Sequence, residues 1–510
     1  MEPVKLFKKL MQRSNFMEKL LILNPNDNVA LATVDIPAQT IVKVNNKKIT
    51  VQDDIPVGNK VALNDLQKDA NIIKFGQSIG HLTANVATGA LINKQNLVTN
   101  QSDSVVNNAD IKDDLPDIDR KTFMGYRREN GKVGIRNDLY IVPTVGCITP
   151  LMDVMVQQFK AKHPDNGSFD NIILLKHPYG CSQLGDDFEQ TRHILCDAVL
   201  HPNAGGVLVF GLGCENNQMD GMKAEIEQME GIDKDRMKFL VAQEVKDEFA
   251  NAQQMLEELN EAAANDKRTP VPLSELKVGL QSVRPDGLST ITADRLIANA
   301  ASYLTAKNGT VALTGIPVLS GAEQEIVKRT PDNDTADKVM TIFDNFKQYY
   351  EHFDSAMHKV PSAAEDRIGI STAEERALTL LRLAGNGEIN DVLPYGHKLT
   401  KSGINIIESP NNDLIDSSAE ASADCQMVIV STGKGTPYST YVPTIKVASN
   451  SALAEKKKRW IDFDGEKATQ SLHGSEELIN FILDIANGKK TSNEKSGLHG
   501  LAIFKIGVTE

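Results

Sequence analysis

Two aliphatic runs, each ended by glycine and cysteine, constrain the fold of this chain more than any other feature. Ile172–Leu175 leads into H-P-Y-G-C-S (His177–Ser182), and Val207–Phe210 leads into G-L-G-C-E-N-N-Q (Gly211–Gln218). Short apolar runs stopped by glycine indicate fully buried strands. Ligands bind at the carboxyl ends of such strands in an open α/β sheet. The residues that the pattern delivers to one crevice are His177, Cys181, Cys214 and Glu215.

A purely structural interpretation of the same residues stands beside this one. A buried thiol is a common small core residue, and a glycine-rich strand end can be only a tight turn. For each residue alone the two interpretations weigh equally. The paired pattern of two similar strand ends favours a site.

Strands and helices alternate through most of the chain. The order strand, helix, strand, helix, strand across residues 139–218 is typical of a parallel sheet. Met222–Leu259 is expected to be a long, charged helical stretch. Further strand and helix signals follow from Leu276 onward, at Val278–Gln281, Thr310–Gly315 and Met427–Ser431. We therefore expect two α/β domains with mainly parallel sheets, at residues 119–268 and 269–510.

The first hundred residues have a different character. After an N-terminal tail (residues 1–16), residues 17–100 are rich in β-formers and turns. Thr40–Val51 carries the signal of a β-hairpin with Asn45 and Asn46 at its tip. A small, irregular all-β domain fits best. Residues 101–118 are acidic, polar and poor in large apolar side chains, and are expected to form a linker.

Composition narrows the class of protein. The formal net charge is −13, which argues against a general nucleic-acid binder. No segment approaches the ~20 apolar residues that cross a bilayer, so no membrane partner is expected. The five cysteines are an odd number and widely spaced, which excludes a disulfide framework and favours a reducing cytoplasm.

Basic residues with glycine neighbours predict an anion site. G-Y-R-R-E-N-G-K-V-G-I-R-N (Gly125–Asn137) places arginines among glycines, and arginine suits bidentate carboxylate binding. A surface hairpin with solvated charges fits that segment equally well. The loop Thr432–Thr440 follows a strand and has no P-loop spacing, although a loop of this composition can cradle an anion. The basic candidates are Arg127, Arg128, Arg136, Lys434 and Lys446.

Long motifs carry a resemblance to a known family. They lie at Gly125–Asn137, Pro143–Cys147, His177–Ser182, His201–Gln218, Thr436–Asn450 and Ala502–Thr509. In these motifs the chain resembles the altronate/galactarate dehydratase family of sugar-acid hydro-lyases, most closely its altronate dehydratase branch. The resemblance implies a β-clip (SAF-like) fold for the N-terminal domain. It also implies loss of water from a six-carbon aldonate to give a 2-keto-3-deoxy acid, assisted by Fe²⁺ or Mn²⁺.

The resemblance and the residue types together imply a set of roles. A mix of imidazole, thiolate and carboxylate suits a borderline divalent metal. The expected catalytic residues are His177, Glu215 and Asp286, and the expected metal ligands are Cys147, Cys181 and Cys214. The five basic candidates are expected to hold a small anionic sugar acid. The resemblance makes the strand ends with His177, Cys181, Cys214 and Glu215 one wall of a larger metal-assisted crevice that faces loops 282–286 and 365–369. The sequence leaves open whether the protein forms a homo-oligomer.

Three segments depart from the family pattern. Ser282–Asp286 reads S-V-R-P-D in place of C-G-G-S-D, Glu365–Asp366 replaces an Asn-Lys pair, and Asn93 and Gln95 stand where histidines are common. Neutral amides are far poorer metal ligands than imidazole. Two hypotheses follow: an active hydro-lyase on an altronate-like acid, and a catalytically impaired paralogue that binds a sugar acid or a sister dehydratase subunit.

Overall fold

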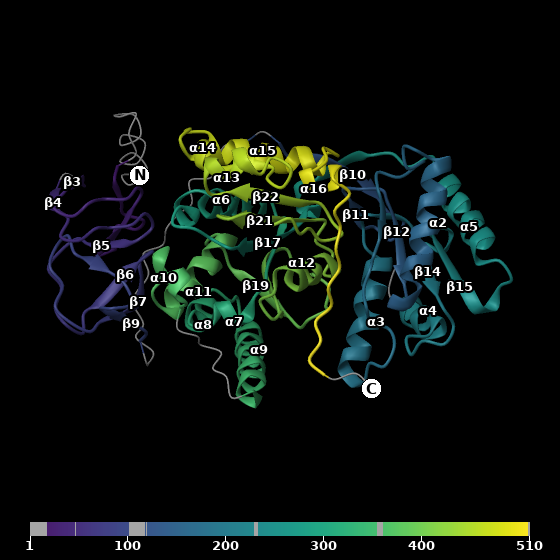
Figure 1. Cartoon of the computed structure of the whole chain (residues 1–510), viewed down its shortest axis with the longest axis horizontal. Helices are drawn as coiled ribbons and strands as arrows, with labels where there is room; N and C mark the ends of the chain where they lie inside the picture. Colours follow the sequence, from purple (N-terminus) through teal and green to yellow (C-terminus); the bar gives the residue numbers. More distant parts are fainter. Residues whose placement is uncertain are drawn as a thin grey trace.

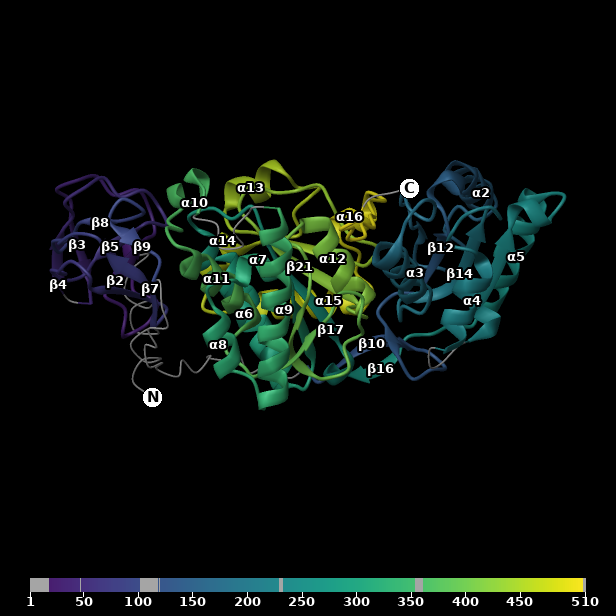
Figure 2. The ribbon, with the colours of Figure 1, turned by 90° about the horizontal axis from the view of Figure 1, so that it is seen from below.

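Three domains lie in a row, and the last domain of the sequence is in the middle (Figure 1). A computed structural model describes residues 18–45, 47–100, 118, 120–228, 233–353 and 361–507. The view turned by 90° shows the same row, with the β domain at one end and the second domain at the other (Figure 2). The predicted tail, nearly all of the predicted linker and Asn46 lie outside the described residues. The predicted fold class, a small β domain and two α/β domains with parallel sheets, is confirmed.

The β domain consists of short antiparallel strands. One sheet has the order β1-β2-β5-β8, β3 and β4 form a separate hairpin, and a third sheet has the order β6-β7-β9. The hairpin pairs Val42 with Ile49, as the sequence predicts. The strands are β1 (Leu20–Leu21), β2 (Val29–Ala32), β3 (Ile41–Val44), β4 (Lys47–Thr50), β5 (Lys60–Ala62), β6 (Asn71–Lys74), β7 (Gln77–Leu82), β8 (Leu91–Ile92) and β9 (Leu97–Val98).

The second domain is a doubly wound sheet with the parallel order β13-β12-β14-β15. Alternate residues of β12 face opposite layers: Leu139 and Ile141 pack with α2 and α5, whereas Tyr140 and Val142 pack with α3 and α4. The chain winds outward from β12 in both directions, so its carboxyl end is a topological switch point. The elements are β12 (Asp138–Pro143), α2 (Thr149–Lys162), β13 (Ile172–Leu174), α3 (Gly185–Val199), β14 (Ala204–Gly211), α4 (Met219–Gln228), β15 (Met237–Val241) and α5 (Glu248–Ala263).

The C-terminal domain has seven parallel strands in the order β19-β20-β18-β17-β21-β22-β23. Its first strand, β17, again lies inside the sheet, with later strands added on both sides. The strands are β17 (Lys277–Val283), β18 (Thr310–Leu313), β19 (Ile389–Leu393), β20 (Gly403–Ile407), β21 (Met427–Thr432), β22 (Thr444–Ala448) and β23 (Phe463–Asp464). The helices are α6 (Ala293–Ala306), α7 (Ile316–Leu319), α8 (Glu323–Lys328), α9 (Asn333–His352), α10 (Ala363–Arg367), α11 (Ala373–Leu381), α12 (Asp413–Ser422), α13 (Ser451–Lys456), α14 (Gly465–Thr469), α15 (Gly474–Ala486) and α16 (Ser492–Lys495).

A small antiparallel sheet joins the two α/β domains. It has the order β11-β10-β16, with β10 (Thr122–Arg127) entering the second domain, β11 (Val133–Gly134) following it and β16 (Thr269–Pro272) leaving it. Because β10 pairs directly with β16, the second domain begins and ends at the same place. In Figure 1 this sheet lies at the junction with the C-terminal domain.

Apolar cores continue across both domain junctions. One cluster contains Ile72 and Phe75 of the β domain together with Leu378 of α11. Another contains Ile194 of α3 together with Ala419 of α12. The continuous burial fixes the domains against one another. No helix in the described ranges has the length and apolarity needed to cross a membrane.

The long helix expected at Met222–Leu259 is wrong. Helix α4 ends at Gln228, an edge strand β15 follows at Met237–Val241, and α5 begins only at Glu248. Strand β15 is half-buried because it lies at the sheet edge, so its sequence lacks the continuous apolar run of a central strand.

Candidate functional site

The three predicted metal ligands lie at the carboxyl ends of three neighbouring strands. Cys147 follows β12, Cys181 follows β13 and Cys214 follows β14, and each is preceded directly by a glycine. Each is also followed, within five residues, by the first residue of a helix: α2, α3 or α4. We call this set of three thiols the cysteine rim. The sequence-based expectation that strand ends deliver these cysteines to one edge of the sheet agrees with their placement.

Hydrogen bonds join the three loops of the cysteine rim. Gly146 N donates to Tyr179 O at 2.8 Å, and Asn217 N donates to Gly180 O at 3.1 Å. The Asn217 side-chain amide also donates to Thr144 O at 3.2 Å. A Cβ atom on Gly180 would lie 2.2 Å from Thr144 O, so only glycine allows this approach. The rim is therefore held by backbone contacts of the loops.

The rim thiols are free, exposed and close enough to interact. Partial desolvation raises the pKa of the Cys147 thiol, and the neighbouring thiols of Cys181 and Cys214 and the Glu215 carboxylate raise it further. Within the described ranges, however, no three His, Cys, Asp or Glu side chains lie close enough together to hold one metal ion.

His177 has a structural role that the sequence does not reveal. Its Nε2–H donates to Pro143 O at 2.9 Å, and its Nδ1 accepts from Tyr179 N at 3.1 Å. Burial lowers the pKa of the imidazole, which stays neutral with its proton on Nε2. With both nitrogens bound to backbone, His177 shapes the loop before Cys181. The predicted catalytic role does not fit this geometry.

The Glu215 carboxylate, like the His177 ring, already has hydrogen-bond partners within the protein. Its carboxylate accepts from the Thr144 hydroxyl, from Leu212 N at 3.1 Å and from Gly213 N at 2.6 Å. The side chain is 2% exposed. Glu215 therefore joins the β12 and β14 loops beneath the cysteine rim, and its position does not suit it to reach a substrate as the predicted catalytic group.

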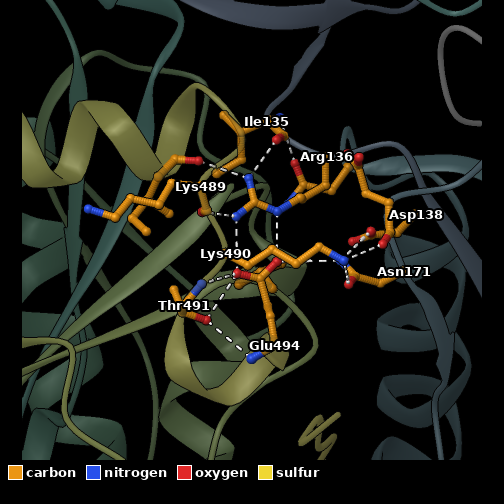
Figure 3. Close-up of polar contacts among 12 residues, drawn as sticks. Ile135, Arg136, Asp138, Asn171, Lys489, Lys490, Thr491 and Glu494 are labelled. Atoms are coloured by element: carbon orange, nitrogen blue, oxygen red, sulfur yellow. Dashed lines mark hydrogen bonds and ion pairs between the residues drawn. The ribbon is translucent and has the colours of Figure 1, made fainter. Parts of the chain in front are cut away.

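Arg136 holds two domains together (Figure 3). Its Nε and Nη2 pair with both oxygens of Glu494 at 2.7 and 3.0 Å. The other N–H groups donate to backbone oxygens of Ile135, Ile485 and Lys489. All five donors of the guanidinium are engaged, so none is left for a substrate carboxylate. The predicted substrate-binding role of Arg136 does not fit the structure.

Of the two neighbouring arginines, Arg128 makes structural hydrogen bonds and Arg127 is exposed to solvent. Arg128 donates to Pro202 O, to the Asn137 side chain and to Arg136 O, all at 2.8–2.9 Å. Arg127 is exposed on β10. Neither of them lines the two cavities described below, and Gly125–Asn137 forms a structural turn at the junction between the α/β domains. Its predicted role as a carboxylate site stays a prediction.

The two predicted lysines also differ from each other. Lys446 is buried in β22 and donates to Thr436 O at 2.8 Å and to Asn493 Oδ1 at 3.3 Å. Burial lowers its pKa to about 8. Lys446 therefore supports the loop after β21, whereas Lys434 on that loop is exposed.

Asp286 lies at the switch point of the C-terminal sheet, where its carboxylate organises two loops. It accepts from Ser449 Oγ and from Asn450 Nδ2, both at 2.7 Å. It also accepts from Ser289 Oγ and Leu288 N, both at 3.0 Å. These bonds connect the loop after β17 to the loop after β22. Asp286 is at the predicted place in the fold, but as a positioning group.

A cavity of about 220 Å³ opens beside Asp286, at the ends of β17 and β18. We call it the strand-end pocket. The described residues that line it all belong to the C-terminal domain: Leu280, Gln281, Ser282, Val283, Arg284, Pro285, Thr314, Gly315, Val318, Glu365, Ile370, Arg376, Thr379, Leu380, Asn411, Asp413 and Asp416. It therefore receives both departing loops, 282–286 and 365–369, and none of the residues of the cysteine rim. The pocket and the rim share no lining residue in the described part of the chain, and the crevice predicted to combine them stays a prediction.

The strand-end pocket contains two cations with free capacity. Arg376 lies on α11, and its Nε is buried with no hydrogen-bond partner among the described residues. Its nearest anion is Glu365 Oε1, 3.7 Å from Nη1. Arg284 is exposed at the mouth, with a left-handed backbone (φ 50°). Each guanidinium can bind a carboxylate, and the same pocket is also lined by the acids Glu365, Asp413 and Asp416.

Two carboxyl groups face the same pocket from the start of α12. Asn412 caps this helix by accepting from Leu414 N and Ile415 N at 3.2 Å. Asp413 and Asp416 are three residues apart, so they lie on one helical face. Burial raises the pKa of Asp413, and Arg284 partly offsets the rise. Burial raises the pKa of Asp416 to about 7, although the Ser409 hydroxyl donates to it.

A larger cavity of about 490 Å³ lies between α3 and the loops after β19 and β20. Its lining includes the acids Asp186, Glu189, Glu225 and Glu408, and the single arginine Arg192. Arg192 is already paired with Glu225 at 3.3 Å. The strand-end pocket has fewer acids, a second arginine and a buried arginine donor, Nε of Arg376, without a partner among the described residues, so it suits an acid better.

The β domain contacts α10, next to the strand-end pocket, through its departing segment and through Asn59. Lys94 N donates to Asp366 Oδ1 at 3.2 Å, and Asn59 Nδ2 donates to Arg367 O at 3.2 Å. The segments around Asn93, Glu365 and Arg284 thus gather on one side of the molecule. Departures that are far apart in the sequence are neighbours in space.

Fold and site together define a three-domain protein with two doubly wound sheets and, beside a switch point, a pocket lined by arginines and carboxyl groups. Models of three domains match the chain: the altronate/galactarate dehydratase SAF domain at residues 18–100, the D-galactarate dehydratase/altronate hydrolase second domain at 125–264, and the D-galactarate/altronate dehydratase C-terminal domain at 273–509. The chain belongs to the altronate/galactarate dehydratase family, as its motifs predict.

Individual relatives agree with the family. The chain is 42% identical to altronate dehydratase of Bacillus subtilis, over 97% of this chain and 100% of that protein. It is also 42% identical to altronate dehydratase of Escherichia coli, over 95% of this chain and 98% of the relative. Galactarate dehydratase (L-threo-forming) of E. coli is 27% identical over 89% of this chain and 90% of its own length.

Sequence interpretation missed Arg376, Asp413 and Asp416. A signal for the two acids exists in E-S-P-N-N-D-L-I-D (Glu408–Asp416), where a strand is followed by an Asn cap and two aspartates at helical spacing. Arg376 carries no comparable signal, since α11 is an ordinary amphipathic helix and only its packing beside α7 brings the side chain to the pocket.

Proposed function

We propose that the protein dehydrates an altronate-like aldonate to a 2-keto-3-deoxy acid in the strand-end pocket. The observation that carries the proposal is the meeting of two arginines and two carboxyl groups, Asp413 and Asp416, in one cavity beside the switch point. Near-full-length similarity to altronate dehydratases supports the choice of substrate class. The free state of the cysteines favours a reducing cytoplasm as the compartment.

The reaction needs three functions from the protein. The carboxylate beside C2 must be held, because its negative charge makes the C2 proton very weakly acidic. A base removes that proton, and an acid protonates the C3 hydroxyl as it leaves. The bond from C3 to oxygen breaks, water departs, and the enol formed between C2 and C3 becomes the 2-keto acid.

The residues of the pocket can be assigned to these functions. Arg376 and Arg284 bind the substrate carboxylate, since Arg376 has an unpaired buried N–H and Arg284 lies at the mouth. Asp413, less buried and near a guanidinium, takes the C2 proton. Asp416, whose pKa burial raises to about 7, is protonated often enough at neutral pH to donate to the leaving hydroxyl.

The predicted Fe²⁺ or Mn²⁺ stays a prediction for this chain. Mn²⁺ prefers oxygen ligands, which the thiols of the cysteine rim do not supply. In the described residues, no set of three suitable side chains closes around one ion. The residues present therefore do not fit a single ion, and no step above passes through one.

The test is turnover of sugar acids by purified protein and two variants. We expect 2-keto-3-deoxy acid from altronate, or from another member of a panel of aldonates and aldarates. Arg376→Met should raise KM at least about tenfold, because a charge-assisted bond of about 1.5–3 kcal/mol is lost. Asp416→Asn should lower kcat by about 10²–10⁴-fold. Arg127→Met, on an exposed side chain, is the matched control and should behave as wild type.

The second hypothesis, an impaired paralogue, draws support from the gathering of three departures around the pocket. It predicts thermal stabilisation by a sugar acid without turnover, and loss of that stabilisation in Arg376→Met. Absence of product from every acid in the panel, with and without added Fe²⁺ or Mn²⁺, would contradict the dehydratase proposal. Binding of a sugar acid without product would support the strand-end pocket as a binding site and would contradict the proposed dehydration there.

A further inference from the structure

We propose that Glu420 is a positioning residue of the strand-end pocket, buried as a neutral carboxylic acid that orients the side chain of Gln281 in the pocket wall. What the pocket binds rests on the proposed function, whereas the neutral state of Glu420 rests on its surroundings alone. Glu420 lies on α12, four residues after Asp416, and is 0% exposed. Neither proton transfer of the proposed dehydration uses it.

The Glu420 carboxyl group lies directly beneath the pocket. Its Oε1 accepts from Leu280 N at 3.1 Å and from the Thr314 hydroxyl at 3.4 Å, and its Oε2 lies 3.2 Å from Gln281 Nε2. All three partners line the pocket. A Cβ atom on Gly279 would lie 2.5 Å from Oε2, so this glycine of β17 leaves the space that the carboxyl group fills. One buried side chain therefore supports three residues of the pocket wall.

The elements that pack against α12 supply no counter-charge to Glu420. Its hydrogen-bond partners in the described part of the chain are all neutral groups. Lys277, the one lysine of β17, donates its Nζ to a backbone oxygen 2.8 Å away. Strand β21 has no charged side chain, and the cations of α3, Arg192 and His193, pair with Glu225.

These surroundings favour the protonated form of Glu420. An ionised carboxylate without a counter-charge is costly to bury, and such a group takes up a proton instead. Burial raises the pKa of Glu420 well above its usual value, and the Asp416 carboxyl raises it further. Glu375 provides the contrast, because it is equally buried but Lys60 and Lys74 keep it ionised. The partners, and not burial alone, separate the neutral acid from the ion.

A neutral acid needs an acceptor for its proton, and the Gln281 amide supplies one. The other end of this amide lies 2.8 Å from the Tyr438 hydroxyl. A half-turn of the amide brings its oxygen to Glu420 and its nitrogen to Tyr438. Glu420 O–H then donates to Gln281 Oε1, and one N–H of Gln281 donates to Tyr438 Oη. Because Gln281 lines the pocket, its second N–H is left for a hydroxyl oxygen of a bound sugar acid.

Infrared difference spectroscopy of the full chain tests the protonation state without substrate. Above the pKa of about 7 of Asp416, the spectrum of wild type minus Glu420→Gln should contain the carbonyl band of a protonated carboxyl group. Wild type minus Glu375→Gln, the matched control, should contain carboxylate bands, because Glu375 is ionised. Carboxylate bands in the Glu420 difference spectrum would overturn the proposal.

Kinetics test the effect of Glu420 on Gln281. Gln281→Leu and Glu420→Leu should each raise KM for the acid that is turned over by about 2–10-fold, the loss of one neutral hydrogen bond. Glu420→Gln keeps a neutral donor to Gln281 and should restore KM, with the alkaline limb of kcat/KM at about pH 7. A limb that moves to lower pH in Glu420→Gln would show that a negative charge has been removed beside Asp416, and would overturn the neutral state.

The two measurements separate this proposal from the proposed function. If no sugar acid is turned over, the dehydratase proposal fails, the infrared band still decides the state of Glu420, and thermal stabilisation by altronate replaces KM as the measure of binding. If an acid is turned over but Glu420→Leu keeps the wild-type KM, the positioning role fails and the dehydration stands. Ser422→Ala is the control on the same helix, because its hydroxyl donates to Ala419 O, and it should keep the wild-type KM.

Discussion

At the scale of single residues, the sequence does not distinguish a catalytic side chain from one with a structural role. His177 and Arg136 are residue types of active sites, and both lie in long family-like motifs. Their partners decide what they do: Pro143 is 34 positions from His177, and Glu494 is 358 positions from Arg136. The sequence does not show that the two residues of either pair lie within hydrogen-bond distance of each other. Arg376 and Asp413 can be recognised as candidate site residues only in the folded structure, where both side chains line the strand-end pocket.

The titration of Asp416 gives a prediction at this scale. The Ser409 hydroxyl lowers the pKa of Asp416, which burial raises to about 7. Ser409→Ala removes the donor, so this pKa should rise further, by about one unit for a bond of about 1.4 kcal/mol. An acid works only while protonated. The alkaline limb of kcat/KM, which falls through about pH 7 in wild type, should therefore move to higher pH.

Ser417→Ala is the matched control for this pH profile. Ser417 lies on the same helix, but its hydroxyl donates to the backbone oxygens of Asp413 and Leu414. Its alkaline limb should coincide with that of wild type. A limb that stays in place or moves to lower pH in Ser409→Ala would remove Asp416 from the role of acid.

At the scale of elements, most of the architecture can be predicted from the chain. The strands β12, β14 and β21 are buried on both faces and therefore contain continuous apolar runs. Edge strands lack this mark: β15 is concealed in a charged segment, and β23 is two residues long. The carboxyl ends of the central strands locate both candidate sites, because ligand position follows topology in such sheets.

One helix, α11, is attached to the β domain by a buried ion triad. Lys60 Nζ and Lys74 Nζ lie 2.9 and 2.6 Å from the carboxylate of Glu375. Burial alone would raise the pKa of Glu375, but the two lysines outweigh burial and lower it, so the acid stays ionised. Glu375→Gln leaves two buried cations without an anion. The loss in unfolding free energy should be about 3–5 kcal/mol by urea denaturation.

An exposed pair between the same two domains provides the comparison. Lys94 is 3.7 Å from Asp366, with 41% of the lysine side chain exposed. Lys94→Ala should cost no more than about 1 kcal/mol. Equal losses in Glu375→Gln and Lys94→Ala would show that burial of the triad does not matter to the attachment of the β domain.

At the scale of the whole molecule, the two α/β domains share a core, and His201 lies inside it. Its Nε2–H donates to Cys425 O at 3.2 Å across the junction, and its Nδ1 accepts from Asn203 N at 3.1 Å. Burial lowers the pKa of His201 to about 3. The unfolded chain binds a proton here below about pH 6.5, whereas the folded molecule does not.

Stability should therefore decrease as the pH falls through this window. Between pH 7 and pH 5 the contribution of His201 amounts to about 2 kcal/mol of unfolding free energy. Urea denaturation at both pH values should show a smaller difference for His201→Gln than for wild type. His473→Gln, on a side chain that is 74% exposed, should keep the wild-type difference. An unchanged difference in His201→Gln would contradict the assignment.

The ion pair of Arg136 and Glu494 has a consequence for the time course of folding. It closes a loop of 358 positions between the second domain and α16. The entropy of closing a loop grows only with the logarithm of its length, so the distance along the chain costs the native state little. Contacts of such high order are nevertheless slow to form. The pair should be among the last contacts made when the chain refolds, after each sheet has assembled on its own, and its formation would mark the docking of finished domains.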